Sequence, residues 1–209
     1  ACSYDQWFQD NMRFTQASFH KLCALLRPLR RKQPATNTKH SFETRVATML
    51  YYVASMGGFR ETAQTFGVSK SWAITAVNEL LTAIADDYRR YIYSPSSLED
   101  WSALQEAFEI RAGVPLVCAA VDGTLIELAR FENYEGWYCR KGYPAVNLQV
   151  VVDPHQRIMS FDMRPGSWSD KKIWAASHFG QHIDGILPPG GFILGDKGYT
   201  LSNAVLIHF

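Results

Sequence analysis

The spacing of apolar residues divides the chain into a helical front half and a strand-rich back half. Before residue 92 the apolar positions recur every three or four residues, the period of a helix with one buried face. Residues 4–29 carry such a stripe, and a second begins at Ser41 and stops at Gly57-Gly58. Beyond residue 115, short apolar runs bounded by Gly, Pro and Asp predict strands instead. We therefore expect an α+β protein with a helical bundle over residues 1–92.

Residues 59–85 show the sharpest pattern of the front half. A short helical segment is followed by Gly67-Val68-Ser69, and Ser69 suits the N-cap of a second helix. A small Ala63 and the turn glycine allow two helices to cross closely, which resembles the helix-turn-helix of DNA-binding proteins. The alternative is a plain pair of packed helices. On the first interpretation, the exposed start of the recognition helix consists of Lys70, Ser71, Trp72 and Thr75.

Charge separates the same two halves. The net charge is +1, yet residues 1–95 carry 12 Lys/Arg and 7 Asp/Glu, whereas residues 96–209 carry 9 and 13. Residues 13–42 contain seven basic side chains and no acidic one: Arg13, Lys21, Arg27, Arg30, Arg31, Lys32 and Lys39. This asymmetry suits a polyanion-binding domain ahead of a metal-binding one, although an ordinary solvated surface gives the same counts. No apolar run approaches the length that a membrane-spanning helix needs, so no membrane span is expected.

The back half predicts the order β-β-β-α-β. Residues 93–115 form a linker and a short helix, and residues 116–209 carry the strands. The near-continuous apolar run of the second strand predicts burial on both faces. We expect the first strand at 117–128, in two apolar runs separated by Gly123-Thr124, then strands at 145–153, 158–163 and 191–195, with a helix at 169–179 before the last.

Three aspartates lie at the ends or starts of these elements. Asp122 closes the first apolar run, Asp170 opens the predicted helix, and Asp196 follows the last strand. A carboxylate in a buried strand is costly unless a cation or donors meet it, and hard divalent cations prefer carboxylate oxygens. The pattern predicts one divalent-metal site. Each aspartate also has a plainer role, as a turn residue for Asp122 and Asp196 and as an acid favoured by the helix dipole for Asp170.

The order of strands and acids looks like the ribonuclease H-like fold, in which the first and fourth strands are neighbours. Five ordered motifs carry a closer resemblance: Val121-Asp122-Gly123-Thr124, residues 138–143, residues 147–153, residues 165–170 and Gly195-Asp196-Lys197-Gly198-Tyr199. Together they resemble the PIF/Harbinger transposases and the nuclease derived from them, within the DDE superfamily of endonucleases. Residues 12–92 are also similar to the helical, helix-turn-helix region ahead of that nuclease domain.

The resemblance implies a DDE-type transposase or domesticated nuclease that cuts DNA phosphodiester bonds with Mg²⁺ or Mn²⁺. The family's metal-binding catalytic acids fall on Asp122, Asp170 and Asp196. Arg140 and Lys141, in an aromatic and basic motif, are candidate DNA contacts or else solvated surface charges. The implied partners are DNA and a separate DNA-binding protein, and the implied location is the nucleus.

One acid of the family's pattern has no counterpart in the 209 residues. A further glutamate is expected on a later helix, so we expect residues 116–209 to be an incomplete nuclease domain with little strand cleavage by itself. Two other functions stay open. One is a catalytically inactive, transposase-derived DNA-binding protein, and the other is a metal-dependent RNA-processing nuclease on the same fold. The helix-turn-helix pattern favours duplex DNA over RNA.

Overall fold

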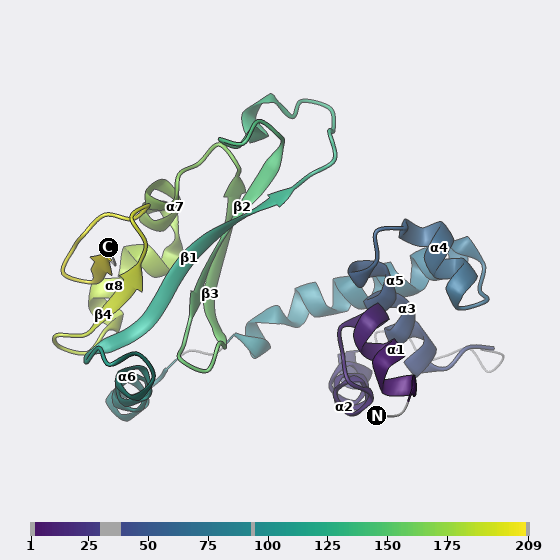
Figure 1. Ribbon diagram of the computed structural model, residues 1–209, viewed down its shortest axis with the longest axis horizontal. Helices are drawn as coiled ribbons and strands as arrows, with labels where there is room; N and C mark the ends of the chain where they lie inside the picture. The colour runs from purple at the N-terminus through teal and green to yellow at the C-terminus, as the bar shows by residue number, and fades with distance from the viewer. Residues whose placement is uncertain (1–2, 30–38, 93–94, 208–209) are drawn as a thin grey trace. The chain divides into compact units, whose positions relative to one another are not determined.

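The computed structural model describes residues 3–29, 39–92 and 95–207. The chain forms two compact units, residues 1–91 and residues 92–209, which we call unit 1 and unit 2 (Figure 1). Three bases of the predicted basic stretch, Arg30, Arg31 and Lys32, lie outside the described residues, as do the first two residues of the predicted linker, Tyr93 and Ser94. No helix in the described ranges is long and apolar enough to cross a membrane.

Unit 1 is helical. Its α-helices are α1 Ser3–Met12, α2 Gln16–Leu26, α3 Phe42–Ala54, α4 Gly58–Thr65 and α5 Lys70–Asp87, with 3-10 turns η1 Arg27–Leu29 and η2 Tyr88–Tyr91. The prediction of one helix over residues 4–29 is wrong. Arg13 adopts a left-handed backbone with φ of 61°, which ends α1, and Thr15 then caps α2 by accepting a hydrogen bond from the Ser18 amide at 3.2 Å.

Small buried side chains bring α4 and α5 together. Ala63 is 5% exposed and Ala73 is 0% exposed, and Gly67 turns the chain between the helices with φ of +61°. Ser69 is the N-cap of α5, as the sequence predicts, and its hydroxyl accepts a hydrogen bond from the Trp72 amide at 3.2 Å. Unit 1 therefore contains a short helix, a tight turn and a longer helix in the expected order.

Unit 2 begins with α6 Leu98–Ala112 and then builds one sheet. Ser97 and Asp100 form a capping box at the start of α6. The remaining elements are β1 Val117–Glu127, η3 Glu135–Trp137, β2 Ala145–Val152, β3 Ile158–Pro165, α7 Asp170–Ala176, α8 His178–Ile186, β4 Phe192–Gly195 and β5 Val205–Ile207.

The sheet is mixed and has the order β3-β2-β1-β4-β5. Strands β1, β2 and β3 pair antiparallel, whereas β4 runs parallel to both β1 and β5. The first and fourth strands are therefore neighbours, as predicted, and the arrangement is consistent with a ribonuclease H-like region. The first strand continues through Gly123-Thr124 without a turn, because Gly123 pairs with Gln149 and Thr124 with Leu148.

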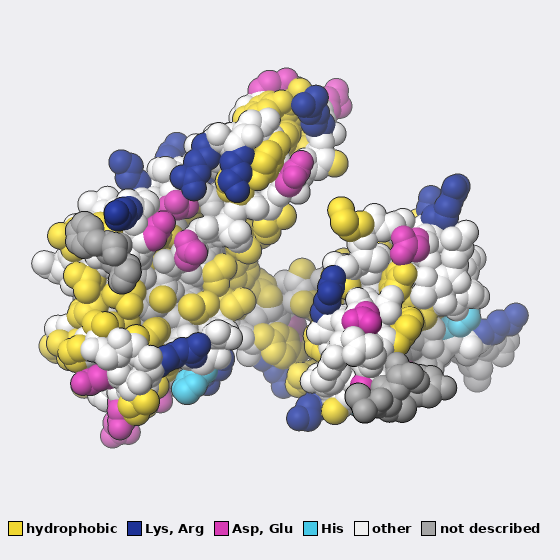
Figure 2. Space-filling model, in the orientation of Figure 1, with side chains coloured by type: hydrophobic (Ala, Val, Ile, Leu, Met, Phe, Trp, Pro, Cys, Tyr) yellow, Lys and Arg dark blue, Asp and Glu magenta, His cyan; other side chains and the backbone are white. Residues whose placement is uncertain are grey.

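The two faces of this sheet differ in burial. One face, which we call the helix face, carries Ala119, Val121, Asn147, Gln149 and Val151, and it forms a core with residues of α6, α7 and α8. The other, the open face, carries Ala120, Asp122, Thr124, Leu148 and Val150. Along β2 buried and partly buried residues alternate, so the predicted burial on both faces is complete on the helix face and only partial on the open face. Hydrophobic side chains are visible over the middle of unit 2 in Figure 2.

The predicted helix over residues 169–179 is two helices. Ser177 adopts an extended backbone with φ of −72° and ψ of 145°, which interrupts the helical run. Its hydroxyl then caps α8 by accepting a hydrogen bond from the Gly180 amide at 3.0 Å. The helix that begins with Asp170, α7, is therefore short and ends at Ala176.

Candidate functional site

Asp170, the first residue of α7, is held on the helix face by two amide side chains of β2. Asn147 Nδ2 donates to Asp170 Oδ1 at 3.1 Å, and Gln149 Nε2 donates to the Asp170 backbone carbonyl at 3.1 Å. Both amides are buried, with 5% and 2% of their surface exposed. Their second bonds, to the Trp168 carbonyl and the Tyr199 hydroxyl, are also 3.1 Å long. Asp170 is thus positioned through both its carboxylate and its backbone.

The carboxylate of Asp170 lies directly against β1 at Gly123. A Cβ added to Gly123 would overlap Asp170 Oδ1 and would lie 3.2 Å from Asn147 Oδ1. Only glycine leaves this space free, which explains in physical terms why Gly follows Asp122. The carboxylate therefore lies over the backbone of the central strand.

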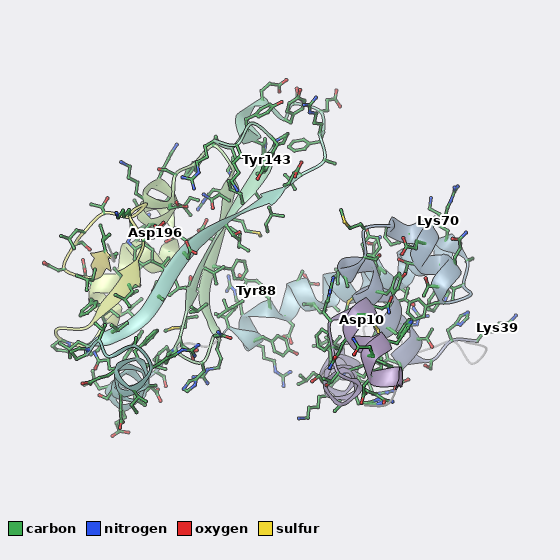
Figure 3. The ribbon with its side chains drawn as sticks, in the orientation of Figure 1. Asp10, Lys39, Lys70, Tyr88, Tyr143 and Asp196 are labelled. Carbon is green, nitrogen blue, oxygen red and sulfur yellow. The ribbon has the colours of Figure 1, made fainter. Side chains whose placement is uncertain are left out.

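Asp196 meets Asp170 on one side of Gly198. Asp196 directly follows β4, and its Oδ1 accepts a hydrogen bond from the Gly198 amide at 2.8 Å. A Cβ added to Gly198 would lie 2.8 Å from Asp170 Oδ2 and 2.9 Å from Asp196 Oδ1. The two carboxylate oxygens therefore border one and the same small space. Figure 3 shows Asp196 at the end of β4, on the side of α7.

Asp122 points to the other face of β1. It pairs with Val150 and is exposed, with its Oδ1 accepting a hydrogen bond from the Gly123 amide at 2.7 Å. Together with Thr124 and Leu148 it lines a separate pocket of about 250 Å³. The structure therefore brings Asp170 and Asp196 together, whereas Asp122 does not share a face with Asp170.

The register nevertheless keeps Asp122 close to the site along the strand. Ala120 pairs with Leu194 between the parallel strands β1 and β4, and Asp122 and Asp196 each lie two residues further on. The two aspartates are thus at the same level of the sheet.

The pKa of Tyr199 is affected by the charges of all three aspartates. Burial, most of all, raises the pKa of this phenol well above its usual range, and the carboxylates of Asp170, Asp122 and Asp196 raise it further. Tyr199 is 5% exposed and its hydroxyl accepts the hydrogen bond from Gln149. It is therefore a neutral phenol that receives the negative field of all three acids.

Basic side chains complete the pocket on the helix face. A pocket of about 380 Å³ is lined by Arg140, Asn147, Asp170, Lys171, Lys197 and Tyr199 among others. Lys141, the other predicted DNA contact of this unit, is exposed. The pocket thus combines a carboxylate with three cationic side chains, a composition suited to a cation and a phosphate together. In Figure 2 acidic and basic side chains lie close together in the region where Figure 3 labels Asp196.

The oxygen atoms at this pocket fit a hard divalent cation in part. Asp170 lines the pocket, Asp196 brings a second carboxylate next to Asp170 around Gly198, and Asn147 Oδ1 is buried with no hydrogen-bond partner among the described residues. All three are oxygen donors of the kind that Mg²⁺ and Mn²⁺ prefer. Within the described ranges, no three His, Cys, Asp or Glu side chains are grouped to hold a metal. The arrangement supports a site built on two aspartates and does not assemble all three.

The predicted DNA-contact residues of unit 1 lie at the start of α5. Lys70, Ser71 and Thr75 are exposed, and Figure 3 labels Lys70 at this helix end. Trp72 is only partly exposed, because its ring packs against His40, with ring centres 4.6 Å apart, and the Arg45 guanidinium lies 5.2 Å from its centre. Trp72 is thus partly used in the packing of unit 1.

The sequence interpretation missed four residues that line the pocket, Asn147, Lys171, Lys197 and Tyr199, and also Gln149, which supports Asp170 and Tyr199 from β2. A usable signal was present for the two amides. Asn147 and Gln149 are two residues apart in an otherwise apolar strand, so they point to one face. Two buried amides on one face require partners there, which marks a polar site on that side of the sheet.

Comparisons with known proteins point to one family. Residues 121–209 match the family described as DDE superfamily endonuclease. The chain is 24% identical over 167 residues to "Putative nuclease HARBI1" of Rattus norvegicus, covering 78% of this chain and 48% of that protein. The proteins of the same name from Bos taurus and Homo sapiens are 23% and 24% identical over 162 residues, each covering 76% of this chain and 46% of theirs. The chain spans about half the length of these relatives. No solved structure matches it.

Proposed function

We propose that the chain, whose residues 121–209 match the DDE superfamily endonuclease family, cleaves DNA phosphodiester bonds with a divalent cation. The observation that carries the proposal is the meeting of two motif aspartates, Asp170 and Asp196, around Gly198. They come from separate motifs, with the rest of α7, then α8 and β4 between them, and only the fold brings them together. The distant homology to a Harbinger-derived nuclease supports the same chemistry.

Asp170 and Asp196 are the residues that would hold the cation. A bound Mg²⁺ or Mn²⁺ supplies Lewis-acid polarisation of a phosphate group. The chain's own contribution is to place the carboxylates, because Asn147 and Gln149 hold Asp170 and the Gly198 amide holds Asp196. Hydrogen bonds of this kind fix the geometry of metal-binding groups before the cation arrives.

We assign Asp122 to the same site as its third acid. The assignment follows the family's pattern and is supported by the shared level of Asp122 and Asp196 on neighbouring strands and by the effect of both on Tyr199. Its carboxylate has to turn from the open face toward the end of β4 to take part. Because Asp122 is exposed, such a turn does not require the core to open.

Arg140, Lys171 and Lys197 are suited to hold the DNA backbone at this pocket. All three line it with Asp170, and cationic side chains bind phosphate oxygens through charge-assisted hydrogen bonds. Lys141, exposed beside Arg140, extends the same basic surface. On this proposal the scissile phosphate lies between the cationic side chains and the aspartates.

The nuclease proposal is tested by plasmid nicking with Mg²⁺ or Mn²⁺, using protein from the complete reading frame. Asp170→Asn and Asp196→Asn are expected to abolish nicking, and Asp122→Asn to lower it at least about 100-fold, because each removes a proposed metal-binding charge. Asp184→Asn, an exposed acid of α8 outside the site, is the matched control and should leave nicking unchanged. Nicking that survives Asp170→Asn and Asp196→Asn would refute the assignment.

A second candidate function is DNA binding by unit 1 through α4 and α5. The exposure of Lys70, Ser71 and Thr75 at the start of α5 favours it, since the first turn of a recognition helix meets the base edges. Affinity for duplex DNA should fall steeply with salt, and Lys70→Ala should lower affinity for all sequences if Lys70 contacts phosphate. Salt-independent binding, or none, would count against it. DNA binding without any nicking would favour the inactive, transposase-derived alternative.

On the same proposal the protein acts in the nucleus, with DNA and a separate DNA-binding protein as its partners. Fluorescence microscopy of the tagged protein tests the location. Affinity purification from nuclear extract treated with nuclease tests the partner, since the treatment removes proteins bridged only by DNA. Exclusion from the nucleus would contradict the DNA-cleaving role in the cell.

A further inference from the structure

Asn147 has a buried oxygen that the rest of the fold leaves without a donor. Its side chain is 5% exposed, and its amide nitrogen donates to the Trp168 carbonyl and to Asp170 Oδ1. Its Oδ1 has no hydrogen-bond partner among the described residues. Buried polar atoms in folded proteins nearly always have a partner, so this oxygen calls for a ligand.

The orientation of the Asn147 amide follows from its neighbours. Both groups that its nitrogen contacts, the Trp168 carbonyl and the Asp170 carboxylate, are acceptors. Reversing the amide would turn its oxygen toward two acceptors and its NH₂ toward the pocket, losing both bonds. The oxygen is therefore directed away from them, toward the space beside Gly123, 3.2 Å from where an added Cβ would stand.

That oxygen faces the same space as the carboxylate of Asp170. Asn147 Oδ1 and Asp170 Oδ1 both lie within 3.2 Å of the point where a Cβ of Gly123 would stand. Asp170 Oδ2 in turn approaches Asp196 Oδ1 around Gly198. Three side chains with oxygen atoms thus lie in a row, with Asp170 of α7 between Asn147 of β2 and Asp196, the residue after β4.

We propose that Asn147 is a neutral oxygen ligand of the divalent cation held by Asp170 and Asp196, an inference that rests on the metal-dependent function proposed above. Side-chain amide oxygens bind hard cations together with carboxylates. Two carboxylates and one amide carry a charge of −2, which balances one divalent cation. The cation would also supply the missing partner of Asn147 Oδ1.

The competing explanation is that Asn147 only positions Asp170 by donating hydrogen bonds, with water at its oxygen. Replacing Asn147 by Asp separates the two roles. Aspartate keeps an oxygen at Oδ1 and adds a negative charge, but it cannot donate to Trp168 or Asp170. If Asn147 is a ligand, the change tightens cation binding. If Asn147 only positions Asp170, the change weakens it.

The experiment measures Mn²⁺ affinity of the whole chain by isothermal titration calorimetry, without DNA. We expect Asn147→Leu to weaken Mn²⁺ binding at least about tenfold, since loss of a ligand or of its supporting bonds has effects of that size. We expect Asn147→Asp to tighten it about tenfold, because added ligand charge raises affinity. Unchanged binding by the leucine variant, or weaker binding by the aspartate variant, overturns the proposal.

The matched control is Gln149→Glu. It makes the same amide-to-acid change two residues along β2 on the same face, at a side chain that donates to the Asp170 backbone and Tyr199. If it tightens Mn²⁺ binding as much as Asn147→Asp, general negative charge and not ligation explains the gain, and the proposal fails.

A thermal readout covers the case in which Asn147→Asp folds poorly without metal. Repulsion between two carboxylates should lower its melting temperature in EDTA, and Mn²⁺ should then raise its melting temperature by more than that of the unsubstituted chain. An equal or smaller rise overturns the proposal. Failure of the nuclease proposal is distinguishable, because Mn²⁺ binding with the expected variant pattern but no DNA nicking would refute cleavage and leave the ligand role intact.

Discussion

Replacing Gly123 by Ala tests whether Asp170 really lies on the central strand. The new methyl carbon would stand below 3.0 Å from Asp170 Oδ1, whereas ordinary contact begins at 3.4 Å. The carboxylate must therefore move away from the strand, which stretches the 3.1 Å hydrogen bond from Asn147. Asp170 is only partly exposed and is held through its backbone by Gln149, so it cannot simply swing into water.

We expect Gly123→Ala to destabilise the protein by about 1–3 kcal/mol, the usual cost of one extra carbon in a packed site. Part of that cost is the weakened bond to a charged group, and part is the overlap itself. Urea unfolding of the whole chain, followed by tryptophan fluorescence, measures the change. Mn²⁺ affinity should fall in the same variant, because the displaced oxygen is a proposed ligand.

A double-mutant cycle with Asp170→Ala tests whether the cost of Gly123→Ala comes from its contact with the Asp170 carboxylate. Once the carboxylate is gone, the added methyl has nothing to displace, so Gly123→Ala should cost no more than about 0.5 kcal/mol in that background. Gly185→Ala, where an added Cβ meets nothing within 4 Å, is the control and should be neutral or stabilising by up to about 1 kcal/mol. Additive costs at Gly123 and Asp170 would show that the two residues do not touch.

Three further predictions concern the scaffold. Ala73→Leu, at a 0% exposed position of α5, should lower the free energy of unfolding in urea by about 1–3 kcal/mol. Ala85→Leu, exposed on the same helix, should lower it by less than about 0.5 kcal/mol. Equal losses would refute the close crossing of α4 and α5. Asp100→Ala should lower the melting temperature at pH 7. Hydrogen bonds from Ser96 and Ser97 lower the pKa of the Asp100 carboxyl below 3.8. The stabilisation that Asp100 gives to the folded protein is therefore complete above pH 3.8 and is lost as the pH falls through the lower folded-state pKa. A difference in melting temperature between the unsubstituted protein and Asp100→Ala that did not change with pH would refute the capping role. Burial and the nearby Glu43 raise the pKa of Cys23 to about 11, so at pH 9 this thiol should stay protonated and react with iodoacetamide only after unfolding in urea, as peptide mass spectrometry can check; rapid native labelling would contradict its burial.

The strand and helix types of this chain follow from local patterns, and their ends do not. Apolar spacing predicts helices before residue 92 and strands after residue 115, and both are present. The break at Arg13 is invisible in that spacing, because it depends on a left-handed backbone at a residue without a turn preference. The end of the helix at Ser177 could have been predicted, since serine is a good N-cap, but the helical spacing of apolar residues continues past it to Phe179.

The sequence selects the three aspartates as candidates but does not indicate the two amides that hold Asp170. A carboxylate beside Gly or at a helix start stands out in an apolar sequence, and the resemblance to the PIF/Harbinger family adds to that signal for Asp122, Asp170 and Asp196. Which face each carboxylate takes depends on strand register, and the register of β1 against β2 sends Asp122 to the open face. The roles of Asn147 and Gln149 appear only once α7 is seen to lie against β2.

The glycines of the site explain why carboxylates can gather here at all. Gly123 and Gly198 each occupy a point where a side chain would overlap or crowd the acids, and Asp170 approaches both. Like charges brought this close repel one another, and the protein offsets the repulsion with donors from Asn147, from Gln149 and from the Gly198 amide. Those donors reach Asp170 and Asp196 but leave Asn147 Oδ1 unpaired. A cation at this point would relieve the repulsion and satisfy that oxygen in one step, so the same interaction accounts for both features of the pocket.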